Sequence, residues 1–231
     1  MEIRYSTHPR DAKHYTTEEL RKEFLISQVF VPGEIKLVYS HVDRMIAGGA
    51  TPLDKPLRLE AGKEIGAEYF LARREMGVIN IGGKGKVILD GEEYVLDARE
   101  GLYVGMGIKE VIFESENPEK PAKFYINSAP AHTSYPTVKI DINKANPRHL
   151  GSLAQSNERT IYQYVHPAVC KSCQLVMGLT VLEPNNVWNT MPCHTHERRM
   201  EVYMYFDLKE NDRVIHFMGE PGETRHIIVK N

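Results

Sequence analysis

From Val29 onward, the chain is divided into short segments rich in Val, Ile, Tyr and Phe, and turn signals separate these segments. In the clearest case the dipeptide Asp90-Gly91 lies between two such segments within residues 86–96. Asp-Gly favours the tight turn that matches the twist of paired strands. Segments this short and this regularly interrupted are typical of a β-sandwich or β-barrel. The sequence therefore predicts an all-β fold.

One helix is expected before this region. Thr16 and Glu19 have the spacing of a capping box, in which each side chain binds the backbone N–H of the other residue. Leu20 and Phe24 follow four residues apart, which places them on one face of a helix over residues 18–26. We therefore expect a short N-terminal helix that packs on the β-structure.

Length and charge exclude several classes of protein. A chain of 231 residues can bury a large core, and its net charge of −2 lacks the basic excess of a general nucleic-acid binder. No apolar run approaches the length of a membrane span, and the N-terminus lacks the apolar stretch of a secretory signal. Neither a nucleic acid nor a membrane is therefore an expected partner.

The chain has only three cysteines, Cys170, Cys173 and Cys193, and so few thiols fit a reducing cytoplasm. Cys170 and Cys173 form a C-x-x-C, which has the spacing of a redox pair. Together with Cys193 and His194 it could also form a zinc site of three sulfurs and one nitrogen. A lone C-x-x-C is a weak signal, and a cysteine within an apolar run behaves as a small apolar residue. We therefore interpret all three as structural.

The strongest chemical signal is His194-Thr-His196, followed by Glu201 and the apolar, aromatic run Val202 to Phe206. Side chains two residues apart on a strand point to the same side, so both imidazoles can face one point. Glu201 would reach that point after a turn. Imidazole and carboxylate ligands suit zinc, iron or manganese. Surface histidines and a solvated Glu201 are the alternative, but an unpaired carboxylate is costly to bury in such a strand, and a metal ion removes that cost.

A faint internal repeat suggests two copies of one β-barrel. Aligning Arg73-Arg74 with Arg198-Arg199 places the apolar Leu71 and Met76 against His196 and Glu201. We therefore expect a metal-free N-terminal barrel over residues 1–130 and a proline-bearing connector over 131–159. A metal-binding C-terminal barrel is expected over 160–231. It is expected to be truncated at its C-terminal end, because counterparts of the first copy's closing strands are missing.

The pattern H-x-H-x4-E is similar to the first metal motif of cupins. The longer string from Trp188 to Tyr203, together with residues 75–83, 129–133 and 223–227, closely resembles the 5-keto-4-deoxyuronate isomerase family, and the likeness runs from the N-terminus to residue 231. This family consists of cytoplasmic double cupins, usually hexameric, that act in the bacterial degradation of pectin and related uronates. The resemblance implies one Zn²⁺ per subunit, held by His194, His196 and Glu201. The family's fourth ligand is a histidine that would lie beyond Asn231.

The resemblance also implies a reaction. The family converts 5-dehydro-4-deoxy-D-glucuronate to 3-deoxy-D-glycero-2,5-hexodiulosonate, which moves a carbonyl from C1 to C2 of an open-chain sugar acid. Either a proton leaves C2 and another arrives at C1, or a hydride shifts between the two carbons. Proton transfer needs a base, and a carboxylate substrate needs a cation, for which the fork of arginine is suited. Candidates for the base are Glu197, Tyr203 and His226, and candidates for binding the substrate carboxylate are Arg198, Arg199 and Arg225.

Two other functions remain open. Two histidines and one carboxylate with open coordination positions also describe non-haem iron oxygenases. A non-catalytic sugar-binding barrel, with a structural metal ion or none, is the second alternative. Neither explains the long matching string around His194, so the ketol-isomerase is the prediction that we carry forward.

Overall fold

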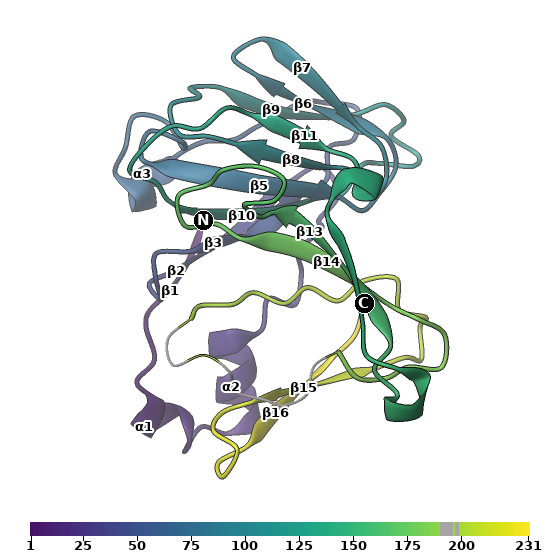
Figure 1. Cartoon of the computed structure of the whole chain (residues 1–231). Helices are drawn as coiled ribbons and strands as arrows, with labels where there is room; N and C mark the ends of the chain where they lie inside the picture. Colours follow the sequence, from purple (N-terminus) through teal and green to yellow (C-terminus); the bar gives the residue numbers. More distant parts are fainter. Residues whose placement is uncertain (190–195, 197–198) are drawn as a thin grey trace.

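The structure of the chain is a computed structural model that describes residues 1–189, 196 and 199–231 (Figure 1). Residues 1–140, called the first half, form two facing β-sheets, and residues 141–231 are called the second half. The larger sheet has seven strands, in the order β1 (Glu2–Arg4), β2 (Ile35–Ser40), β3 (Ile46–Ala50), β10 (Phe124–Pro130), β5 (Arg74–Asn80), β8 (Gly101–Val104) and β11 (Val138–Ile140). The smaller sheet has four, in the order β4 (Leu57–Arg58), β9 (Val111–Ser115), β6 (Gly85–Leu89) and β7 (Glu92–Leu96).

The second half adds two further sheets. One contains β12 (Pro147–Leu150), β13 (Arg159–Val165) and β14 (Met177–Leu182), and the other is the antiparallel pair β15 (Val214–Met218) and β16 (Arg225–Val229). Figure 1 shows β15 and β16 beside the N-terminal helices, at the opposite end of the molecule from β6 and β7. The helices are short: α1 (Pro9–Ala12), α2 (Thr17–Phe24), α3 (Gly62–Ile65) and the 3-10 turns η1 (Ile142–Lys144) and η2 (Leu153–Gln155). No helix of the described residues could span a membrane.

The central strands of the seven-stranded sheet, β3, β10, β5 and β8, are buried on both faces. Along β10, Phe124 and Ile126 enter the core between the two sheets of the first half, whereas Tyr125 and Ala129 enter a second core. This alternation is the period of two expected for a strand. The second core is completed by side chains of β13 and β14, such as Tyr164. The second half therefore packs on the outer face of the large sheet.

Several features of the fold match the sequence predictions. The all-β class is confirmed. The N-terminal helix is confirmed as α2, with its capping box: the hydroxyl of Thr16 accepts from the Glu19 N–H at 3.2 Å, and the Thr16 N–H donates to the Glu19 carboxylate at 2.6 Å. The hairpin around Asp90-Gly91 is present as β6 and β7. Within the described residues the four sheets are open, and none closes into a barrel.

Three segments differ in detail from what the sequence indicates. The helix ends at Phe24 and not at residue 26, because Leu25 adopts an extended backbone conformation. The run from Val202 to Phe206 is extended but is not a strand. Within the expected connector 131–159, β11 joins the large sheet of the first half and β12 pairs with β13 of the second half.

A buried carboxylate joins the two halves. Glu75 on β5 is fully buried and faces the second core, where Tyr103 O–H donates to its Oε2 at 2.8 Å. Three consecutive backbone N–H groups of the second half, those of Cys173, Gln174 and Leu175, also donate to this carboxylate, each at 2.7 Å. Hydrogen bonds to an ionised acceptor are stronger than neutral ones. Glu75 therefore fixes the segment that precedes β14 onto the outer face of the large sheet.

We predict that Glu75→Gln lowers the free energy of unfolding by about 3 kcal/mol, because the amide NH₂ would face N–H donors and leave buried groups unsatisfied. For a chain of this length, the loss corresponds to a decrease in Tm of about 9 °C. The matched control is Glu119→Gln in an exposed turn, which should unfold like the wild type. Thermal unfolding followed by circular dichroism checks both variants, and equal Tm values for Glu75→Gln and wild type would contradict the anchoring role.

Candidate active site

A cavity of about 650 Å³ lies between the N-terminal arm (residues 1–30), the outer face of the large sheet and the second half of the chain. The outer face is the one that points away from the four-stranded sheet. The arm lines it with residues such as Arg4 and Phe24, the sheet with Tyr125, and the second half with the segment 199–207 and inward residues of β15 and β16. Elements from both ends of the chain thus form its walls. This volume falls in the range of sites that bind small molecules.

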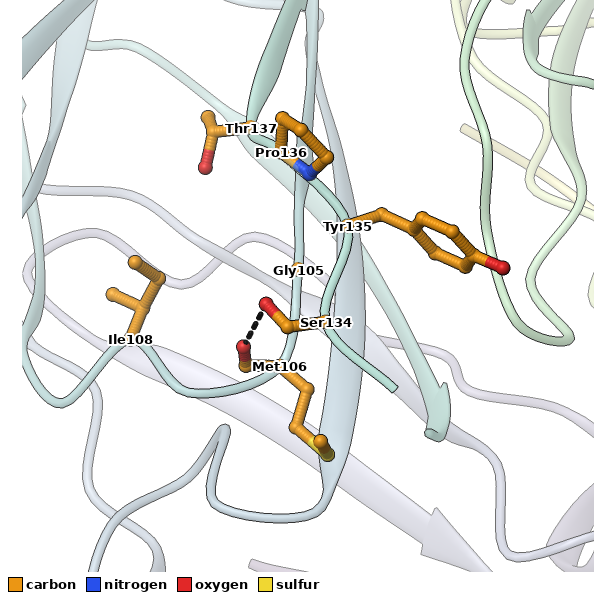
Figure 2. Close-up of a pocket in the computed structure, with 7 residues that line it drawn as sticks. All are labelled: Gly105, Met106, Ile108, Ser134, Tyr135, Pro136 and Thr137. Carbon is orange, nitrogen blue, oxygen red and sulfur yellow. Dashed lines mark hydrogen bonds between the residues drawn. The ribbon is translucent and has the colours of Figure 1, made fainter. Parts of the chain in front are cut away.

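A second hollow, of about 350 Å³, lies elsewhere on the first half. Figure 2 shows its lining, in which the Ser134 hydroxyl donates to the Met106 carbonyl at 2.7 Å. The remaining lining residues are Gly105, Ile108, Tyr135, Pro136 and Thr137. This lining includes none of the site residues predicted from the sequence and no acidic or basic side chain. The larger cavity is therefore the candidate site.

One wall of the cavity is the extended segment from Glu201 to Phe206. Val202, Met204 and Phe206 pack against the second core, which is the alternation of a strand, although the segment pairs with no other strand of the described residues. Tyr203 and Tyr205 stack with ring centroids 6.5 Å apart. The alternate positions 201, 203 and 205 therefore supply the polar groups of this wall.

Glu201 is paired with two side chains, Tyr203 and Arg199. Tyr203 O–H donates to its Oε2 at 2.9 Å, and Arg199 Nη1 donates to its Oε1 at 3.2 Å. The side chain of Glu201 is 42% exposed. The expectation that its carboxylate would be buried in an apolar strand is therefore wrong, because the segment lines an open cavity.

His196 lies close to Glu201. Its Nε2 is within hydrogen-bonding distance of Arg199 Nη1, the same nitrogen that donates to Glu201. One predicted imidazole ligand and the predicted carboxylate ligand therefore converge on a single positively charged group. The His196 nitrogen and the Glu201 oxygen that meet this group are also atoms that can bind a metal ion.

The remaining predicted residues of this motif, His194, Glu197 and Arg198, lie outside the described residues. Among the residues that the structure describes, no group of three His, Cys, Asp or Glu side chains is arranged to hold a metal ion. Cys193 also lies outside this set. Cys170 and Cys173 are free thiols, Cys170 is buried, and burial raises its pKa.

Among the cavity residues that sequence reasoning did not single out is His216 on β15. Its Nδ1 lies 2.8 Å from the Tyr205 hydroxyl, and its ring lies 5.2 Å from that of Tyr203. Burial lowers the pKa of His216, whereas the negative charge of Glu201 acts in the opposite direction. The available signal was the alternation along β15, where Ile215 and Phe217 are exposed and His216 faces inward.

Tyr203 and His226 differ in how they meet the cavity. Burial, and then the hydrogen bond to Glu201, raise the pKa of Tyr203 to about 12, so its phenol is protonated at neutral pH. His226 is exposed on β16, and its neighbour Ile227 is the residue that lines the cavity. Because successive residues of a strand face opposite sides, the His226 side chain points away from the cavity.

Arg225 holds the N-terminal arm. Its guanidinium donates to the carbonyls of Ala12 at 3.2 Å and Lys13 at 2.8 Å, and also to that of Tyr15. Arg21 of α2 donates in turn to the Ile228 carbonyl at 2.9 Å. These contacts join the arm to β16 and thereby close one side of the cavity.

Comparison with known proteins gives the family. The model of the KduI/IolB family matches residues 25–228, which is most of the chain. The chain belongs to the KduI/IolB family. Relatives of this family cover the whole chain, and the chain spans 84% of the length of those described next.

Three of these relatives each carry the name 4-deoxy-L-threo-5-hexosulose-uronate ketol-isomerase. They are proteins of Caldicellulosiruptor bescii, 61% identical, of Lachnoclostridium phytofermentans, 60% identical, and of Halalkalibacterium halodurans, 57% identical, each over 231 residues. Among solved structures, an IolB-like protein from Salmonella typhimurium LT2 matches with a TM-score of 0.39 and 13% identity, over 52% of this chain and 43% of that one. That likeness is too distant to add to the argument.

We predict that Arg225→Ala loosens the N-terminal arm, because three backbone carbonyls lose a charged donor. Amide hydrogens of residues 12–24 should exchange at least about tenfold faster, which corresponds to ~1.4 kcal/mol of local stability. The matched control is Arg213→Ala, since Arg213 donates only to carbonyls of its own turn among the described residues. Hydrogen exchange followed by mass spectrometry measures both variants, and unchanged exchange in Arg225→Ala would exclude the clamp.

Proposed function

We propose that this member of the KduI/IolB family is a ketol-isomerase. It would convert 5-dehydro-4-deoxy-D-glucuronate to 3-deoxy-D-glycero-2,5-hexodiulosonate. The observation that carries the proposal is the similarity over the whole chain, at 57–61% identity, to three relatives named as ketol-isomerases of this hexosulose uronate. The cavity supports it, because it is large enough for a six-carbon sugar acid and combines carboxylate, phenol and imidazole groups on one wall.

We also propose that the site holds one Zn²⁺ through His194, His196 and Glu201, with iron or manganese as alternatives that suit the same ligands. The convergence of His196 and Glu201 on the positive charge of Arg199 supports this ligand set. When bound, such an ion would act as a Lewis acid toward the carbonyl and the neighbouring hydroxyl of the substrate.

The side chains of the chain itself would bind the substrate and move its protons. Arg198 and Arg199 are proposed to bind the substrate carboxylate, for which the guanidinium fork is suited. Arg225 is a weaker candidate, because both of its terminal nitrogens already donate to carbonyls of the N-terminal arm. Among the described residues, Arg199 donates through Nη1 alone. Among the bases predicted from the sequence, Glu197 remains a candidate, whereas the raised pKa of Tyr203 and the outward position of His226 favour neither.

The setting of the reaction is part of the proposal. We propose that the enzyme acts in the cytoplasm, in the degradation of pectin and related uronates, and that it is a hexamer. An apolar face on β15 and β16 supports association between copies, since Ile215, Phe217 and Ile228 are 54%, 52% and 41% exposed. Trp188 stacks on Phe217 with ring centroids 6.4 Å apart and extends this face. Exposed apolar patches of this kind mark interaction sites.

We predict that His196→Ala loses bound zinc and isomerase activity together, because the proposed ligand set would lose one of its imidazoles. Turnover should fall by at least about 100-fold. Aldehyde loss from the keto-uronate measures activity, and elemental analysis of the purified protein measures the metal ion.

The matched control is His149→Ala, since His149 is exposed on β12 and contacts Glu158 and Thr160. This variant should keep both the metal ion and the activity. Full activity in His196→Ala would refute the ligand assignment. The absence of turnover in a wild-type version that also carries the family's fourth ligand would refute the proposed function.

A further inference from the structure

If the isomerisation proceeds by proton transfer, it needs one group that removes a proton from C2 and returns a proton to C1. The residues on the cavity wall restrict the choice. Glu201 is engaged by Tyr203 and Arg199, and the hydroxyl of Tyr203 is itself bonded to Glu201. Among the described residues, the wall has one further side chain whose ring nitrogens suit proton transfer at neutral pH, His216.

His216 is held in place from two sides. Its Nδ1 and the Tyr205 hydroxyl are 2.8 Å apart, and the rings of Tyr203 and Tyr205 lie 5.2 and 6.1 Å from its own. On β15 it pairs with Ile227, another residue of the cavity lining. A base must be oriented by a partner on its other ring nitrogen if its free nitrogen is to face the substrate.

We propose that His216 is the base that carries the proton between C2 and C1, with Tyr205 as the residue that positions its ring. This inference rests on the proposed isomerase function. It assigns Nε2 as the reactive nitrogen and requires the tautomer in which Nδ1–H donates to the hydroxyl oxygen of Tyr205. Tyr205 keeps its own proton, because burial raises its pKa.

Protons and electrons balance in this step. His216 Nε2 takes the proton from C2, the electrons of the broken C2–H bond form a C1=C2 double bond, and the aldehyde oxygen O1 becomes an oxyanion. The imidazolium then returns its proton to C1 and restores the neutral ring. The proton of the C2 hydroxyl passes to O1, and C2 becomes the ketone. Substrate and product are isomers, so no oxidant, reductant or other co-reactant is consumed.

The first test compares His216→Gln with the wild type. A general base contributes about 10²- to 10⁴-fold to a rate, so kcat should fall by at least about 100-fold, while the content of bound metal stays unchanged. In D₂O, part of the wild-type product should carry solvent deuterium at C1, because the imidazolium exchanges its proton with solvent in a fraction of the turnovers. A variant within about threefold of the wild type, a variant that loses the metal ion, or a wild-type product without deuterium would each overturn the assignment. His149→Gln serves as the exposed control.

A second variant covers the case in which His216→Gln fails to fold. Tyr205→Phe keeps the ring and removes only the acceptor of the Nδ1–H, so kcat should fall by about tenfold with KM unchanged. A rise in KM at constant kcat would assign Tyr205 to substrate binding and would contradict its positioning role.

A measurement without turnover separates this inference from the proposed function. In ¹⁵N-labelled wild-type protein at pH 7, the ring signals of His216 should show an unprotonated Nε2 and a protonated Nδ1. Protonation on Nε2 would overturn the His216 assignment even if the enzyme is active. An inactive wild-type version that also carries the family's fourth ligand would instead refute the isomerase function and, with it, the role of His216.

Discussion

The structure depends on the hydrogen bonds between one buried carboxylate and the backbone of the opposite half. Glu75 is fully buried, and four donors within 2.8 Å satisfy it, three of which are successive amides of residues 173–175. An ionised group is costly to bury unless its lone pairs are satisfied. The carboxylate is therefore compatible with only one position of this segment. That position fixes β14 and, through it, the part of the chain that leads to the cavity.

Small residues on the outer face of the large sheet allow the halves to approach closely. A Cβ atom on Gly77 would lie 2.7 Å from the sulfur of Met177, and one on Gly101 would lie 2.6 Å from the ring of Tyr164. Real Cβ atoms do not approach their neighbours this closely, so a larger residue at either position would force the facing side chain of the second half to shift. The hydroxyl of Tyr164 donates to the Arg99 carbonyl beyond this contact. The hydrogen bonds of Glu75 and the close approach that Gly77 and Gly101 allow thus together hold the second half against the sheet.

Local patterns predicted the local features, and long-range contacts decided the rest. The capping box of Thr16 and the Asp90-Gly91 turn are encoded within a few residues, so both could be predicted from the sequence. The sequence also indicated that His196 and Glu201 belong to one site, and the structure brings both to Arg199. Open sheets in place of closed barrels, and the extended but unpaired run at 202–206, depend on which distant strands find partners. No local pattern specifies that choice.

His216 and Arg225 show why the residues of the site and their partners could not all be predicted from the sequence. His216 stands in a short strand with no neighbouring histidine or carboxylate, and it acquires its environment from Tyr203 and Tyr205, more than ten residues earlier in the chain. Arg225 has the residue type of an anion-binding group, yet its partners are carbonyls about 210 residues away. Because the cavity walls come from both ends of the chain, the cavity forms only when the arm is clamped on β16 and the second half is anchored at Glu75. Stability of these two contacts and the geometry of the site are therefore coupled.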